Sequence, residues 1–159
     1  MKSIERAHIA VVAGGDRRLI LAAHLSRMQA ARATFLAGVG EAHAFCLSDT
    51  PDICLVAFDD WALDAAPPAG IDAPGRDAGV PSLLLIGAVT PYIRRLARHC
   101  GYFAAVPTTI APRLLYRRMC AALQHQGTEV AEARVPSEVS AGARRFTAEM
   151  AELRKSTRH

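Results

Sequence analysis

The sequence predicts one α/β domain, built on a doubly wound, five-stranded parallel sheet with helices on both faces, and a C-terminal helical tail. Five short apolar runs recur along the chain, and the segments between them mostly place apolar residues at helical spacing. Runs that are apolar at every position are typical of parallel strands buried on both faces. With 159 residues, 51% of them apolar, the chain can bury one good core.

The predicted strands are apolar runs bounded by turn residues. The first run is HIAVVA, and the third, ICLVAF, follows a turn made by Pro51 and Asp52. In chain order we expect strands at residues 8–13, 33–39, 53–58, 82–86 and 102–106.

The predicted helices alternate with these strands, as parallel pairing requires. Asp16 is the expected N-cap of the first helix, and Pro112 opens the last one at its first turn. The predicted helices span residues 17–30, 40–48, 91–100 and 112–123. After the third strand, paired prolines and repeated glycines predict that the third crossover helix is short or missing.

The composition changes near residue 125, which predicts a domain at 1–125 and, at 126–159, a linker with an amphipathic C-terminal helix. In this tail apolar residues recur at alternating spacings of four and three, namely Val139, Ala143, Phe146, Met150 and Leu153. The tail could form a short coiled coil, dock on the domain, or connect domains in a longer protein.

The composition and residue spacing argue against a membrane span, a signal peptide, disulfides and a metal site. No apolar stretch approaches the roughly 20 residues of a membrane span, and the N-terminus lacks a signal-peptide pattern. The cysteines and histidines are scattered without metal-ligand spacing. We therefore expect a cytoplasmic chain without a membrane segment, a disulfide or a metal site.

Three phrases carry a resemblance to a known family: GEAHAFCLSDTPDICLV, GVPSLLLIGA and HCGYFAAVPTTIAPRLLYRRMCAAL. In their order and spacing they resemble the receiver domain of bacterial response regulators, over roughly residues 7–125. The resemblance implies a flavodoxin-like, receiver-type fold. It also implies a place in two-component signal transduction, for example inside a hybrid sensor histidine kinase.

The chemistry of that family is phosphoryl transfer from a histidine kinase to an aspartate, with Mg²⁺ held by acids and the phosphoryl group by a hydroxyl and a lysine. Carried over by position, the acid pair falls on Ala13 and Gly14, the phosphoacceptor on Ala57, the hydroxyl on Gly87 and the lysine on Val106. None of these residues can do the chemistry. The resemblance therefore indicates a degenerate, phosphorylation-incompetent pseudo-receiver that is not an enzyme and needs no cofactor.

Other interpretations of the same region remain open. Asp59 lies two residues beyond the acceptor position, on the same side of a strand, and could be a displaced acceptor with Asp16 and Asp60 holding Mg²⁺. Phe103 matches the family's switch aromatic, although an aromatic there also fills a core.

A small nucleotide-binding or enzymatic α/β domain is an alternative from another class. It would use the crevice at the strand ends, where the sequence places Gly14, Gly15, Asp16, Asp59 and Gly87. However, AGGDRR matches neither GxGxxG nor the P-loop pattern, and Arg17 and Arg18 are as readily explained as the solvated first turn of a helix.

The charge distribution predicts an interaction face. Residues 78–128 contain no aspartate or glutamate, while the last two predicted helices carry Arg94, Arg95, Arg98, Arg113, Arg117 and Arg118. The resemblance makes this face a candidate interface, although arginines also solvate amphipathic helices. An acidic protein partner fits better than DNA, because no DNA-reading motif is present. The expected partners are a histidine kinase, another signalling protein, or a second copy of the chain.

Overall fold

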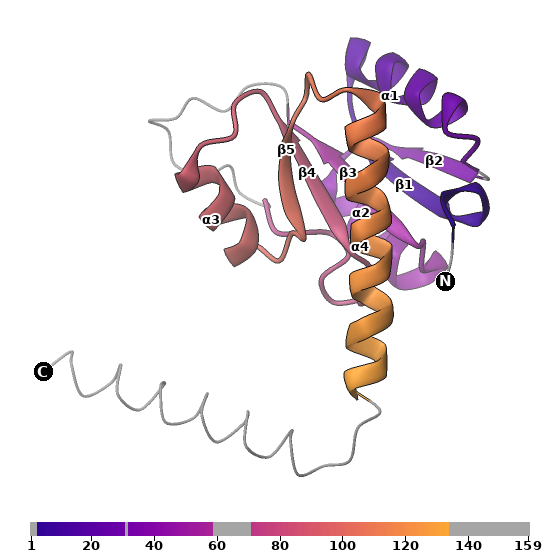
Figure 1. The fold of residues 1–159 in the computed structure, drawn as a ribbon, viewed down its shortest axis with the longest axis vertical. Coiled ribbons are helices and arrows are strands. Elements are labelled where there is room, and N and C mark those ends of the chain that lie inside the picture. The colour runs from indigo at the N-terminus through magenta and orange to yellow at the C-terminus, as the bar shows by residue number, and fades with distance from the viewer. Residues whose placement is uncertain (1–2, 31, 59–70, 134–159) are drawn as a thin grey trace, which may run out of the picture. The chain divides into compact units, whose positions relative to one another are not determined.

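The computed structural model describes residues 3–30, 32–58 and 71–133 of the chain, and it confirms the predicted fold class. A five-stranded, all-parallel sheet has the order β2-β1-β3-β4-β5 (Figure 1). Its strands are β1 His8–Val12, β2 Arg32–Leu36, β3 Ile53–Ala57, β4 Ser82–Ile86 and β5 Ala104–Pro107. The helices are η1 Ile4–Arg6, α1 Gly15–Arg27, α2 Val39–Asp49, α3 Pro91–His99 and α4 Pro112–Ala133.

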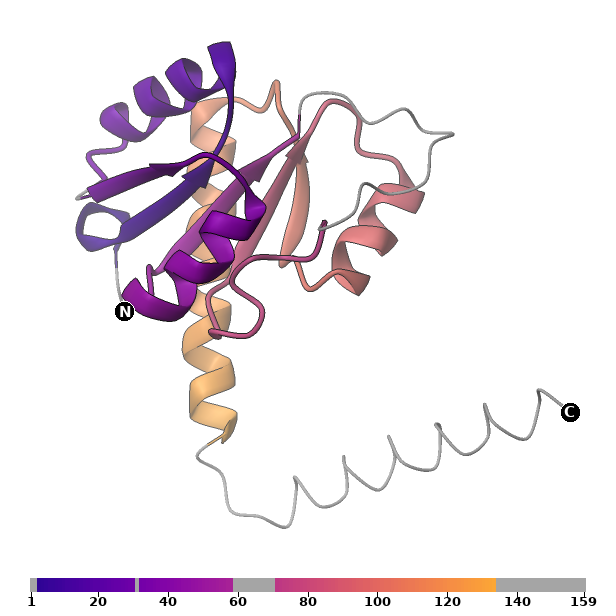
Figure 2. The ribbon, with the colours of Figure 1, turned by 180° about the vertical axis from the view of Figure 1, so that it is seen from behind.

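Two hydrophobic clusters lie on opposite faces of the sheet. One cluster joins alternate strand residues such as Leu55 and Leu85 to Leu21 of α1 and Leu115 of α4. The other joins the intervening residues, such as Val56, to α2, to α3 and to the segment before β4. Figure 1 shows α4 over one face and Figure 2 shows α2 over the other. The strands are apolar at consecutive positions because both faces are covered.

The ends of several elements differ from the prediction. Helix α1 begins at Gly15 with Gly14 as its N-cap, so the assignment of Asp16 as the cap is wrong. The glycine pair supplies the non-helical backbone, and Asp16 falls in the first turn, where a negative charge is favourable. The second strand stops at Leu36 because α2 already begins at Val39.

Turns before β4 cover the sheet in the crossover from β3, where the sequence predicts that the helix is short or missing. Residues 71–81 contain turns and no helix, and residues 59–70 lie outside the described part of the chain. Ile71, Ala73 and Val80 nevertheless bury their side chains in the second cluster. The Ala73 amide donates to the Cys100 carbonyl at 2.9 Å, which ties this segment to the end of α3.

Helix α4 continues past residue 125 to Ala133, so the first part of the expected linker is helical. The chain divides into two compact units, Met1–Gln126 and Gly127–His159. The amphipathic stretch expected at Val139–Leu153 lies outside the described residues. None of the described helices is both long and apolar enough to cross a bilayer.

The stability of the fold should depend on pH through His8 at the amino end of β1. Its Nε2 lies 2.9 Å from Thr34 Oγ1, and its ring packs edge-on against Phe45. Burial, followed by the charge of Arg32, lowers the pKa of His8 below its ordinary 6.5, against the opposing charges of nearby aspartates. The folded protein then holds fewer protons here than the unfolded chain, so this contribution is present above about pH 6.5 and is lost as the pH falls.

We therefore expect the urea midpoint of the wild type to fall between about pH 7 and pH 5 more steeply than that of His8→Gln. Equal slopes in His8→Gln and the wild type would contradict this account.

Helix α2 ends with backbone strain at Thr50. This β-branched residue adopts φ 43°, in the left-handed region where glycine has no penalty. We expect Thr50→Gly to raise the free energy of unfolding by about 1 kcal/mol, as measured by urea denaturation. Thr50→Ala keeps the Cβ atom and should gain much less, so equal gains would show that strain is not the cause.

Candidate functional site

The candidate site lies at the carboxyl edge of the sheet, where the ends of the central strands and the loops after them meet. Ala57 ends β3 and pairs in register with Leu85 of β4, which pairs with Val106 of β5. Ala13 follows β1 directly and is 8% exposed. This is the edge at which open parallel sheets bind their ligands.

The positions carried over from the receiver family have small or apolar side chains here. Ala57 is half-buried, and Val106 is 3% exposed and packs in the core with Leu115. Gly14 and Gly87 are exposed on the loops after β1 and β4. The site therefore has no side-chain oxygen or amine at any of these positions.

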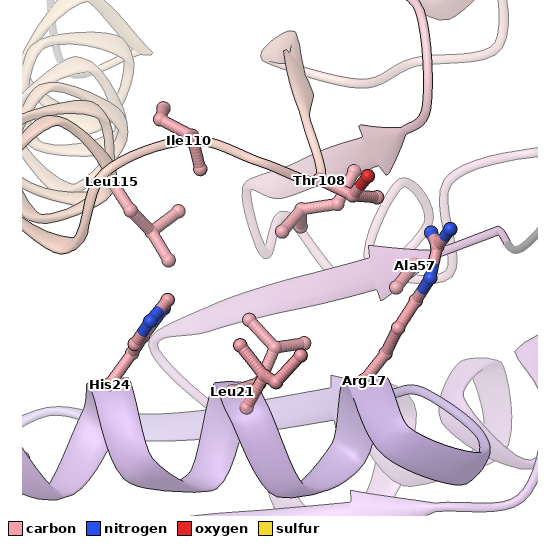
Figure 3. A pocket seen from close by; sticks show the side chains of 9 residues that line it. Arg17, Leu21, His24, Ala57, Thr108, Ile110 and Leu115 are labelled. Atoms are coloured by element: carbon pink, nitrogen blue, oxygen red, sulfur yellow. The ribbon is translucent and has the colours of Figure 1, made fainter.

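Arg17 reaches into the site from the first turn of α1. Its Nη1 donates to the main-chain carbonyl of Phe58 at 2.8 Å, just beyond the end of β3. Figure 3 shows the side chain extending from α1 toward Ala57. A cation in the first turn of a helix opposes the helix dipole, at a cost of about 0.3–1 kcal/mol. The charge-assisted hydrogen bond offsets that cost.

The two adjacent arginines have different surroundings. Arg17 is half-buried in the site, whereas the exposed Arg18 places its guanidinium 5.1 Å from the ring centre of Phe35 on β2. The explanation of both as a solvated first turn is therefore wrong for Arg17.

A cavity of about 30 Å³ lies beside Arg17. Its lining is mostly apolar and comes from α1, β3, β4, the segment after β5 and α4: Arg17, Ile20, Leu21, His24, Ala57, Leu85, Thr108, Ile110 and Leu115 (Figure 3). The volume is that of about one water molecule and is too small for a nucleotide. His24 lines this cavity, and its Nδ1 is buried without a hydrogen-bond partner among the described residues.

Sequence reasoning missed Arg17, His24 and Thr108 as residues of this site. The spacing of Arg17, Leu21 and His24 by four and three places them on one helix face. Because Leu21 belongs to the core, that spacing could have identified the two polar residues. Thr108 supplies the hydroxyl at this edge, and its amide donates to the Ile86 carbonyl at 2.9 Å.

Two of the remaining predicted residues, Asp16 and Phe103, belong to the described part of the chain. Asp16 is exposed on the first turn of α1, and Asp59 and Asp60 lie outside the described residues. Phe103 lies at the opposite, amino end of β5, where its half-buried ring packs against the core and contacts His125 edge-on at 5.3 Å. That packing is what a core aromatic requires, and a switch role for Phe103 remains a prediction.

The predicted interaction face contains a groove of about 800 Å³ lined by residues of α3, β5 and α4. The edge strand β5 lies between these two helices in Figure 1. All the arginines of the face are exposed, but only Arg94, Arg117 and Arg118 line the groove. Leu114, which is 50% exposed, contributes apolar surface. Among the described residues that line the groove, none carries a carboxylate, so this part of the lining is basic and apolar.

Comparison with solved structures identifies the fold. A CheY-like response-regulator receiver domain from Methanospirillum hungatei JF-1 has a TM-score of 0.56 at 16% identity, over 78% of this chain and 98% of that chain. The activated receiver domain of RstA from Klebsiella pneumoniae matches with a TM-score of 0.56 at 19% identity, over 73% of this chain and 97% of that chain.

The chain has the fold of a response-regulator receiver domain. A protein from Burkholderia pseudomallei K96243 described as pilus assembly-related also matches, with a TM-score of 0.61 at 21% identity, over 78% of this chain and 94% of that chain. No family model and no curated protein matches the sequence. In this receiver fold, α3 follows β4 and α4 follows β5, so these helices correspond to the fourth and fifth helices of the resemblance.

Proposed function

We propose that the chain is a receiver-like module of bacterial two-component signalling that is not phosphorylated and acts through protein contacts. The observation that carries this proposal is Ala57 at the acceptor position, with a methyl group where the chemistry needs a carboxylate and an arginine beside it. Phosphoryl transfer depends on placed charges that stabilise the transition state. Without these charges the proposed module does not catalyse phosphoryl transfer.

The groove between α3 and α4 is the proposed contact surface. Its arginines and exposed Leu114 favour an acidic partner with an apolar ridge, such as a histidine kinase or another signalling protein. A second copy of the chain is the alternative occupant. Arginine and apolar residues are enriched in interface centres, which supports a contact here over a merely solvated surface.

The absence of phosphorylation can be tested by NMR titration with Mg²⁺ and then beryllofluoride, which mimics a phosphoryl group. We expect the backbone amide signals of the wild type to stay unchanged, because Ala57 offers no acceptor. The same titration on Asp59→Asn is the control. Shifts around Asp16 and Phe103 in the wild type that vanish in Asp59→Asn would instead establish a displaced acceptor.

Partner binding can be tested by reversing charge inside and outside the groove. Arg117→Glu changes a lining residue, whereas Arg113→Glu makes the same change on an exposed residue of α4 outside the lining. Partners would be captured from extracts of the source cell on the full chain and quantified by mass spectrometry. We expect Arg117→Glu to weaken capture of acidic partners about tenfold, or about 1.4 kcal/mol, and Arg113→Glu to weaken it far less. Equal losses would exclude the groove as the specific contact.

A further inference from the structure

The fold suggests a divalent cation at the carboxyl edge, and the described residues there do not fit one. Mg²⁺ is held by oxygen ligands, usually with one or two carboxylates. Ala13, Gly14 and Ala57 provide no side-chain oxygen at the ends of β1 and β3. The charged group that the structure places beside Ala57 is the guanidinium of Arg17.

The position of Arg17 follows from packing as well as from charge. Its neighbours on the same helix face, Leu21 and His24, line the same cavity, so the side chain extends along an apolar wall before its head reaches Phe58. A larger side chain at position 57 would compete for this space. The small residue and the long one are therefore complementary.

A guanidinium at this position also opposes metal binding directly. It donates to a main-chain carbonyl, an oxygen of the kind that binds hard cations. A divalent ion bound at this edge would compete with the guanidinium for that oxygen.

We propose that Arg17 is a built-in cation that takes the place of a metal ion, holding the start of α1 against the end of β3 and making the site independent of metal. This inference rests on the proposed function and gives it a physical basis. Arg17 is a positioning residue. A phosphorylatable site must gain and lose charge, whereas the cation beside Ala57 is part of the chain itself.

The first test introduces a carboxyl probe into the full chain. In Ala57→Asp the new carboxyl would lie beside Arg17, and an adjacent arginine lowers the pKa of an aspartate by about 1–3 units. We expect this lowering in Ala57→Asp and in the control Arg18→Gln/Ala57→Asp, and its loss in Arg17→Gln/Ala57→Asp. The pKa would be read from the carbon-13 signal of the carboxyl during a pH titration. An equal pKa in the two double variants would overturn the proposal.

The second test uses the native site and does not depend on the introduced carboxyl. Arg17→Gln should speed hydrogen exchange of the Phe58 amide, which donates to the Leu85 carbonyl at 3.0 Å, and Arg18→Gln should not. Unchanged exchange in Arg17→Gln would show that Arg17 does not hold this end of β3.

Failure of this inference differs from failure of the proposed function. If the wild type ignores beryllofluoride but the introduced carboxyl does not sense Arg17, only the role of Arg17 is wrong. If the wild type responds to beryllofluoride through Asp59, the proposed function is wrong. Saturable Mg²⁺ shifts at the end of β3 in the wild type would overturn the metal-independent site in either case.

Discussion

Burial of the central strands on both faces is the constraint on which the rest of the structure depends. Every residue of β4, and Ile53–Val56 of β3, is buried. Parallel strands of this kind need cover on both sides, which α1 and α4 supply on one face and α2 and α3 on the other. Polar chemistry is thereby excluded from the middle of the sheet and confined to its ends and its edges.

The carboxyl edge exists whatever residues occupy it, because the fold brings the ends of β1, β3 and β4 together. With carboxylates there, a cation from solution would be needed to neutralise them. Ala13, Gly14 and Ala57 place no carboxylate at these three positions, and the long cationic side chain of Arg17 occupies the space beside Ala57. The residues at these positions and Arg17 are therefore best understood as one arrangement.

The strands and the fold class could be predicted from sequence because runs such as SLLLI carry the signal at every position. The helix spacing places Arg17 on the same face as Leu21, but the hydrogen-bond partner of Arg17 could not be predicted locally. Arg17 and Arg18 are neighbours of the same type, and about 100° of helix rotation separates their directions. Only the docking of α1 on the sheet determines that Arg17 faces β3 and Arg18 faces Phe35.

The same limit applies to the interaction face. The absence of acidic residues from positions 78–128 predicts a basic surface. Arg113 and Arg117 belong to the same helix, however, and of these two only Arg117 lines the groove. That difference depends on how α4 packs beside β5, through Leu115 and Met119 in the core. Sequence therefore predicts the charge of a surface more readily than its shape.

The candidate site at the carboxyl edge and the groove are separated by one short stretch of chain, the connection from β5 to α4. Thr108 faces the cavity beside Arg17, Pro107 and Thr109 line the groove, and Ile110 lines both. A change in packing that moves Ile110 at the cavity therefore also changes the lining of the groove. In the proposed function the groove binds its partner without a preceding switch, so its binding-competent form must already be populated.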